Sequence, residues 1–141
     1  MRRYKIGYTT GVFDMFHVGH LNIIHKAKQQ CDHLIVGVST DDLVEEYKHK
    51  RPVIPFEERI EIIRALRDVD EVVPQTSMDK YAAWEYLRYD VLFHGDDWKD
   101  SEMYRRVTEK LSSVGVDVVY FARTPGISST QLRSAKNEKI D

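Results

Sequence analysis

The chain has 141 residues, of which 42% are hydrophobic and 31% charged, with a formal net charge of -2. This size and balance exclude a disordered or fibrous chain and favour one globular domain over residues 1–141. A net charge near zero provides no field that would attract nucleic acid or an acidic membrane, so we expect neither partner and look for anion sites built locally.

The first residues and the cysteine content bear on where the protein works. The N-terminal segment lacks the uninterrupted apolar core of a signal peptide and soon reaches Asp14. Cys31, the single cysteine, cannot form an intramolecular disulfide, which favours a reducing compartment. No stretch approaches the length of a membrane span. We therefore expect a cytoplasmic protein.

Five apolar runs of strand length alternate with stretches of helical period. The runs cover residues 4–9, 34–39, 71–74, 90–95 and 117–122. Between them, the apolar residues of Phe56–Arg67 fall on one helical stripe, and those of 103–114 do the same. Strands that alternate with helices predict a parallel sheet with right-handed crossovers. We expect an α/β fold, a Rossmann-like, doubly wound, parallel five-stranded sheet with helices on both faces.

The segment TTGVFDMFHVGH follows the first predicted strand and contains a pair of histidines at the start of a predicted helix. In doubly wound sheets, ligands bind outside the carboxyl ends of the strands. A helix start presents unpaired N–H groups and a partial positive charge, so His17 and His20 would point with it toward an anion. Gly11 would permit a sharp turn, and Gly19 would let the backbone approach the bound group.

Other interpretations of this loop stay open. The two histidines could be ordinary polar residues, or they could bind a transition metal together with Asp14, as in a metal-dependent hydrolase. The loop matches neither the dinucleotide fingerprint nor the phosphate-binding loop that ends in Gly-Lys-Ser/Thr.

Three later segments could bind phosphate or nucleotide. RTPGISST places Arg123, hydroxyl groups and a glycine between the last strand and a helix, where they suit a polyphosphate or simply cap the helix. YKHKRP places Lys48 and Lys50 in a loop that is either a lid over phosphates or solvated surface. HGDDW places Asp96 and Asp97 at a strand end, where carboxylates could hold a base, a ribose or Mg²⁺, or cap a helix.

Taken together, these segments resemble the cytidylyltransferases of the HxGH nucleotidyltransferase superfamily, most of all the short glycerol-3-phosphate cytidylyltransferases. The resemblance covers nearly the whole chain and rests on GVFDMFHVGH, GVSTDD, the basic loop with FEERIEIIRALRDVDEV, GDDW and RTPGISST. It implies transfer of CMP from CTP to a small phosphorylated alcohol, with release of pyrophosphate. It also implies Mg²⁺ as the cofactor and a homodimer as the assembly.

The resemblance further implies which residues do the work. It places His17 and His20 on the CTP phosphates. We expect the catalytic residues to be His17, His20, Lys48 and Arg123. The residues expected to bind the nucleotide are Thr10, Gly11, Phe13, Gly19, Asp96, Arg123, Thr124, Gly126, Ile127, Ser128, Ser129 and Thr130. Those expected to bind the substrate are Lys48, Lys50, Arg59 and Arg67, and Asp14 is the candidate metal ligand.

Two departures from the glycerol-phosphate enzymes concern the acceptor. TGVFD is closer to the choline- and ethanolamine-phosphate cytidylyltransferases, and Pro125 stands where many relatives have Glu. We expect glycerol-3-phosphate as the acceptor, with phosphocholine, phosphoethanolamine and sugar or polyol phosphates as alternatives. An adenylyltransferase that uses ATP and a non-catalytic nucleotide-binding module are the rival functions.

Overall fold

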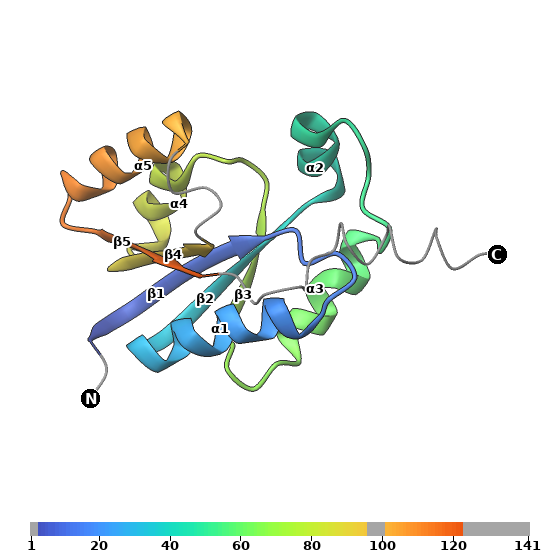
Figure 1. Ribbon diagram of the computed structural model, residues 1–141, viewed down its shortest axis with the longest axis horizontal. Helices are drawn as coiled ribbons and strands as arrows, with labels where there is room; N and C mark the ends of the chain where they lie inside the picture. The colour runs from blue at the N-terminus through green and yellow to red at the C-terminus, as the bar shows by residue number, and fades with distance from the viewer. Residues whose placement is uncertain (1–2, 96–100, 123–141) are drawn as a thin grey trace.

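The computed structural model of the chain describes residues 3–95 and 101–122, in which strands and helices alternate (Figure 1). The strands are β1 (Tyr4–Gly11), β2 (Cys31–Ser39), β3 (Glu71–Gln75), β4 (Val91–Gly95) and β5 (Asp117–Phe121). The helices are α1 (Val18–Gln30), α2 (Asp41–Lys48), α3 (Phe56–Arg64), α4 (Lys80–Leu87) and α5 (Glu102–Ser112). All five predicted strands are present. The helix expected after Thr130 lies outside the described residues.

The strands form one sheet in the order β3-β2-β1-β4-β5, and every neighbouring pair is parallel. β2 lies inside the sheet, and Leu34, Val36 and Val38 are fully buried, which explains why LIVGV reads as a continuous apolar run. β3 lies at one edge and carries Pro74 opposite Val38. The predicted five-stranded parallel sheet is therefore confirmed.

Helices cover both faces of the sheet, as predicted (Figure 1). On one face, α1 and α3 contribute Ile24, Ala27, Ile60 and Ile63 to a core that includes alternate residues of the strands. On the other face, Tyr104 and Leu111 of α5 belong to a second core, and Trp84 and Leu87 of α4 pack against it. None of the helices in the described ranges is long and apolar enough to cross a membrane.

The direction of winding reverses between β1 and β4. β1 pairs with β2 on one side and with β4 on the other. Helix α1 connects β1 to β2, and α4 connects β3 to β4. In parallel sheets of this kind, the loops that leave two such neighbouring strands diverge and open a crevice at the carboxyl edge. The histidine loop, residues 12–17, leaves the end of β1 at this point.

Candidate active site

The two histidines form the N-terminal cap of α1, as the sequence predicts. His17 is the N-cap residue, and its Nδ1 accepts a hydrogen bond of 3.0 Å from the Gly19 backbone N–H. His20 reaches back, and its Nδ1 accepts a hydrogen bond of 3.2 Å from the His17 backbone N–H. This is a capping box in which imidazoles take the places of the usual hydroxyl and carboxylate.

The cap determines the tautomer of each imidazole. A ring nitrogen that accepts a hydrogen bond carries no proton, so in the neutral form the proton of each histidine resides on Nε2. The two rings stack with centroids 3.9 Å apart and planes inclined by 24°. The Nε2 atom of His17 is buried and has no hydrogen-bond partner within the described part of the chain. The helix start therefore holds two N–H donors, and among the described residues the His17 Nε2–H has no acceptor.

Burial keeps His17 and His20 neutral. His20 packs against both Phe13 and Phe16, with ring centroids 5.5 and 5.3 Å away. Its pKa is lowered to about 4, first by burial and then by the neighbouring His17, while the Asp14 carboxylate opposes the change. Burial also lowers the pKa of His17. At neutral pH both imidazoles are therefore hydrogen-bond donors without charge.

Acid should destabilise the fold through His20. Between its ordinary pKa of 6.5 and its folded pKa of about 4, His20 binds a proton in the unfolded chain but stays unprotonated in the folded chain. The free energy of unfolding therefore falls as the pH falls through this window, by about 2–3 kcal/mol at pH 4. Urea unfolding between pH 7 and 4 should show a steeper loss for the wild type than for His20→Gln. Parallel curves would contradict a neutral, buried His20.

The turn before α1 is made by residues other than the expected glycine. Phe13 and Met15 have φ values of 55° and 50°, in the left-handed region, whereas Gly11 is the last residue of β1. A Cβ atom on Gly11 would lie 2.9 Å from the Phe13 ring. Gly11 is therefore needed for the close packing of this ring, which corrects the prediction that it permits the turn.

Asp14 fastens the histidine loop to the segment before α3. Its Oδ2 accepts from the Val53 N–H at 2.8 Å and its Oδ1 accepts from the Ile54 N–H at 2.9 Å. Asp14 as a whole residue is only 2% exposed. Both oxygens are thus committed to backbone amides, so Asp14 is a structural residue in this loop. This corrects the expectation of a metal ligand.

The described residues do not fit a metal held by the protein. In residues 3–95 and 101–122, no three His, Cys, Asp or Glu side chains gather as metal ligands would. The hydrolase interpretation, in which Asp14 joins His17 and His20 on a transition metal, therefore lacks its ligand set in this part of the chain. Mg²⁺, which prefers oxygen ligands and commonly arrives with substrate phosphates, finds no carboxylate cage here.

Arg59 is a buried scaffold residue. Its side chain is 0% exposed, and its Nη1 donates to the carbonyl oxygens of Val12 and Ser39, both at 2.7 Å. Its Nε donates to the Ile54 carbonyl at 2.8 Å, and Nη2 donates to the Asp41 carboxylate at 2.6 Å. One guanidinium thus joins the histidine loop, the end of β2, the start of α2 and the segment before α3. It holds the scaffold together, which corrects the expectation that it binds substrate.

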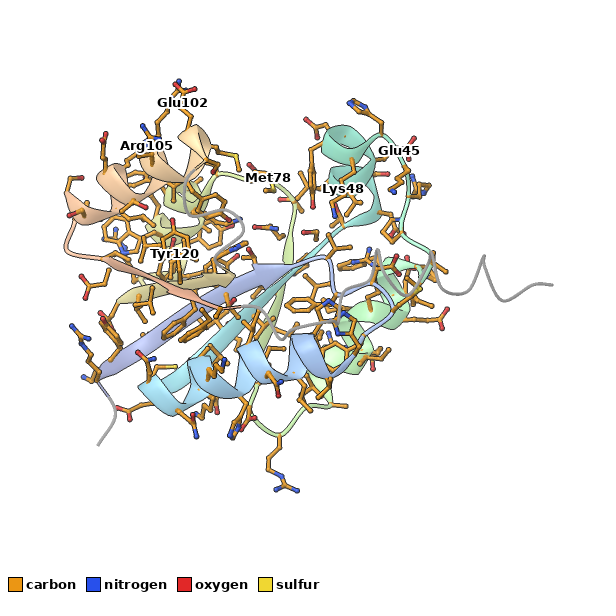
Figure 2. The ribbon with its side chains drawn as sticks, viewed as in Figure 1. Glu45, Lys48, Met78, Glu102, Arg105 and Tyr120 are labelled. Carbon is orange, nitrogen blue, oxygen red and sulfur yellow. The ribbon has the colours of Figure 1, made fainter. Side chains whose placement is uncertain are left out.

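A basic hollow of about 320 Å³ lies beside the histidine loop. Its lining residues are Val12, Asp14, Val44, Lys48, Lys50, Arg51 and Pro52. Lys48 ends α2, on which Figure 2 also labels Glu45. Arg51 donates to the Glu45 carboxylate at 2.5 Å. The two lysines predicted to serve phosphates therefore line the same hollow as the histidine loop.

Arg67 lies away from this hollow. It is exposed in the connection between α3 and β3. Nearby in the same connection, Asp68 contacts His25 at 3.1 Å and Asp70 contacts Lys28 at 2.6 Å, both on α1. This connection leads to the first residue of β3, so Arg67 lies near the edge at which the strands begin. Within one chain it does not line the hollow beside the histidine loop, and its substrate-binding role stays a prediction.

The other predicted site residues divide into two groups. Thr10 and Phe13 are each 8% exposed, at and just after the end of β1. The rest lie outside the described residues, and their roles stay predictions: Asp96, Arg123, Thr124, Gly126, Ile127, Ser128, Ser129 and Thr130.

A buried polar group at the same edge of the sheet is not predicted from the sequence. Ser39 ends β2, Gln75 ends β3 and Lys80 begins α4, and these residues are 1%, 5% and 1% exposed. The only sequence feature that could have indicated this group is that each residue lies at a strand end or helix start.

Comparison with known proteins shows the family of this chain. The family model described as Cytidylyltransferase-like matches residues 8–135. A glycerol-3-phosphate cytidylyltransferase from Bacillus subtilis (strain 168) is 33% identical over 132 residues, which cover 89% of this chain and 92% of that protein. A FAD synthase from Pyrococcus abyssi is 39% identical over 109 residues, which cover 77% of this chain and 72% of that protein.

Solved structures share the fold. A lipopolysaccharide core biosynthesis protein from Thermoplasma volcanium superposes with a TM-score of 0.74 at 25% identity, covering 86% of this chain and 98% of the other. A pantoate-beta-alanine ligase from Francisella tularensis superposes with a TM-score of 0.62 at 15% identity, over 97% of this chain and 70% of the other. The family match spans most of the residues that build the histidine cap and the parallel sheet, and by it this chain belongs to the cytidylyltransferase-like family of nucleotidyltransferases.

Proposed function

We propose that this chain transfers CMP from CTP to the phosphate of a small phosphorylated alcohol, with glycerol-3-phosphate as the acceptor. The observation that carries the proposal is the pair of neutral Nε2–H donors at the start of α1, next to a hollow lined by two lysines. Such a site suits an anion on which negative charge accumulates. The relatives named glycerol-3-phosphate cytidylyltransferase support the choice of nucleotide and acceptor.

The reaction needs little from the protein beyond orientation and charge stabilisation. An acceptor phosphate oxygen attacks the α-phosphorus of CTP in line, and a new P–O bond forms. The bond to the oxygen that bridges the α- and β-phosphates breaks, and pyrophosphate leaves with the negative charge. A phosphate monoester is already a nucleophile near neutral pH, so a strong general base is unnecessary.

The histidines would stabilise the charge that moves toward the bridging oxygen. Because Nδ1 of each ring is engaged in the cap, each ring would donate through Nε2. A donor that the cap and the surrounding rings already hold in place needs little reorganisation when charge develops. Lys48 and Lys50, which line the hollow, would attract the phosphates of the nucleotide and the acceptor.

Transfer of AMP from ATP is the second candidate. The relative that favours it is the FAD synthase of Pyrococcus abyssi, since FAD contains an adenine nucleotide. The chemistry at the α-phosphorus would be the same. The two functions therefore differ in the base that is recognised and in the acceptor.

The deciding experiment measures pyrophosphate release with Mg²⁺ and either CTP or ATP. The acceptor panel contains glycerol-3-phosphate, phosphocholine, phosphoethanolamine and several sugar or polyol phosphates. We expect release with CTP and glycerol-3-phosphate, absent without acceptor. Release only with ATP would replace the proposal by the adenylyltransferase. Binding of CTP without release across the panel would indicate a nucleotide-binding module.

Two expectations from the resemblance, Mg²⁺ and a homodimer, and the cytoplasmic location expected from the sequence join this proposal as predictions. Mg²⁺ would accompany the nucleotide phosphates, so EDTA should abolish release and added Mg²⁺ should restore it. A homodimer should elute at twice the mass of the chain in size-exclusion chromatography with light scattering. A tagged chain should fractionate with the cytoplasm.

A further inference from the structure

Lys80 is a buried lysine that the proposed reaction does not use. It is 1% exposed, it is the first residue of α4, and its Nζ donates to the Gln75 Oε1. Within residues 3–95 and 101–122, no carboxylate forms a salt bridge with it. Burial lowers its pKa to about 8, with the Asp79 carboxylate opposing the change. A buried amine without an acidic partner is destabilising, so its presence calls for a reason.

Lys80 determines how the Gln75 side chain is oriented. An ammonium group only donates, so the Gln75 oxygen must face it and the amide nitrogen must point the other way. That nitrogen donates to the Ser39 Oγ at 2.8 Å. The Gln75 backbone carbonyl also accepts from the Thr40 N–H at 3.1 Å, at the N-cap of α2. Gln75 therefore joins the end of β3 to the end of β2 and to the start of α2.

The path continues from Ser39 into the histidine loop. The Ser39 carbonyl accepts from Arg59 Nη1, and the same nitrogen donates to the Val12 carbonyl, each at 2.7 Å. Hydrogen bonds thus link Lys80 through Gln75 to the Ser39 side chain, and the Ser39 backbone carbonyl continues the path to Arg59 and Val12. Val12 follows β1 and lies five residues before His17.

We propose that Lys80 is a positioning residue for the transfer reaction, acting through Gln75 and Ser39 on the Arg59 guanidinium that holds the histidine loop. This inference rests on the proposed function. A lysine kept for stability alone would be unnecessary, because a buried ionic or polar group can often be replaced by apolar residues without loss of stability. Positioning a loop that carries transition-state donors does require such a directed path, since small displacements at a reacting centre reduce the rate strongly.

The test compares Lys80→Met with the double variant Lys80→Met/Gln75→Met. The single variant leaves the buried Gln75 oxygen without a donor, whereas the double variant removes that unpaired group and should recover the melting temperature. We expect both variants to lower kcat about tenfold to a hundredfold, with the KM for CTP within about twofold of the wild type. A kcat that returns together with the melting temperature in the double variant would make Lys80 merely structural and would overturn the proposal.

A second readout needs no turnover. The NMR signals of the His17 and His20 rings should shift in Lys80→Met, measured without substrate. They should not shift in Lys26→Met, which removes an exposed lysine from α1. Unchanged histidine signals in Lys80→Met would overturn the proposal even if kcat falls. If the wild type transfers no nucleotide at all, the proposed function fails, and the NMR comparison alone still decides whether Lys80 acts on the histidine loop.

Discussion

Replacing His17 by Asn, or His20 by Gln, should lower turnover about 10²–10³-fold, the loss typical of removing one transition-state donor. Both variants should keep the helix cap, because Asn is a favoured N-cap residue and Gln is a usual third residue of a capping box. Neither side chain holds an N–H in the rigid ring geometry of the imidazole Nε2. Pyrophosphate release should therefore fall while the melting temperature stays within about 3 °C of the wild type.

Two further variants separate catalysis from capping. His17→Ala removes both the donor and the cap, so it should lose similar turnover and in addition about 1 kcal/mol of stability. His25→Asn changes a histidine whose side chain is 57% exposed on the same helix, and it should leave turnover unchanged. Near-normal turnover in His17→Asn and His20→Gln would refute the role of the imidazoles in stabilising charge.

Replacing Arg59 by Met should lower the free energy of unfolding by about 3–5 kcal/mol, the range seen when one partner of a buried ion pair is removed. The change removes the donor that Arg59 provides to the carbonyls of Val12, Ser39 and Ile54 and to the Asp41 carboxylate. Urea unfolding measures the loss directly.

Arg64→Met is the matched control on the same helix. The Arg64 side chain is 53% exposed and pairs with Glu61, so its replacement should change stability by less than about 0.5 kcal/mol. Arg59→Lys keeps the charge but lacks the planar fork, and its stability should lie between those of Arg59→Met and the wild type. Equal stability of Arg59→Met and Arg64→Met would contradict the scaffold role.

The strands and their order along the chain were predictable because each apolar run must be buried. Leu34, Val36 and Val38 have no exposed surface, and a run of this composition is typical of an inner strand of a parallel sheet. The position of the histidines was predictable for a similar reason, since the change from strand to helix period locates the helix start at His17. Strong periodic signals therefore carried both predictions.

Arg59 shows what the sequence left undetermined. It lies three residues after Phe56 and four before Ile63, so helical spacing already placed it on the buried stripe. An arginine nevertheless suggested an anion ligand. The acceptors that surround it are mostly backbone carbonyls from distant segments, so its scaffold role was not predictable. Every residue has a backbone carbonyl, so a sequence pattern cannot predict which of them will accept from Arg59. The same holds for Asp14, whose partners are two backbone N–H groups.

Pro74 limits how copies of this chain could associate. It stands in β3, an edge strand whose outer side would otherwise offer backbone donors to a foreign strand. Proline has no N–H group, so a neighbouring strand would find a gap in the hydrogen-bond ladder there. Sheet extension across β3, the common route to edge-to-edge aggregation, is thereby hindered. Copies of this protein should therefore not associate by pairing strands across β3.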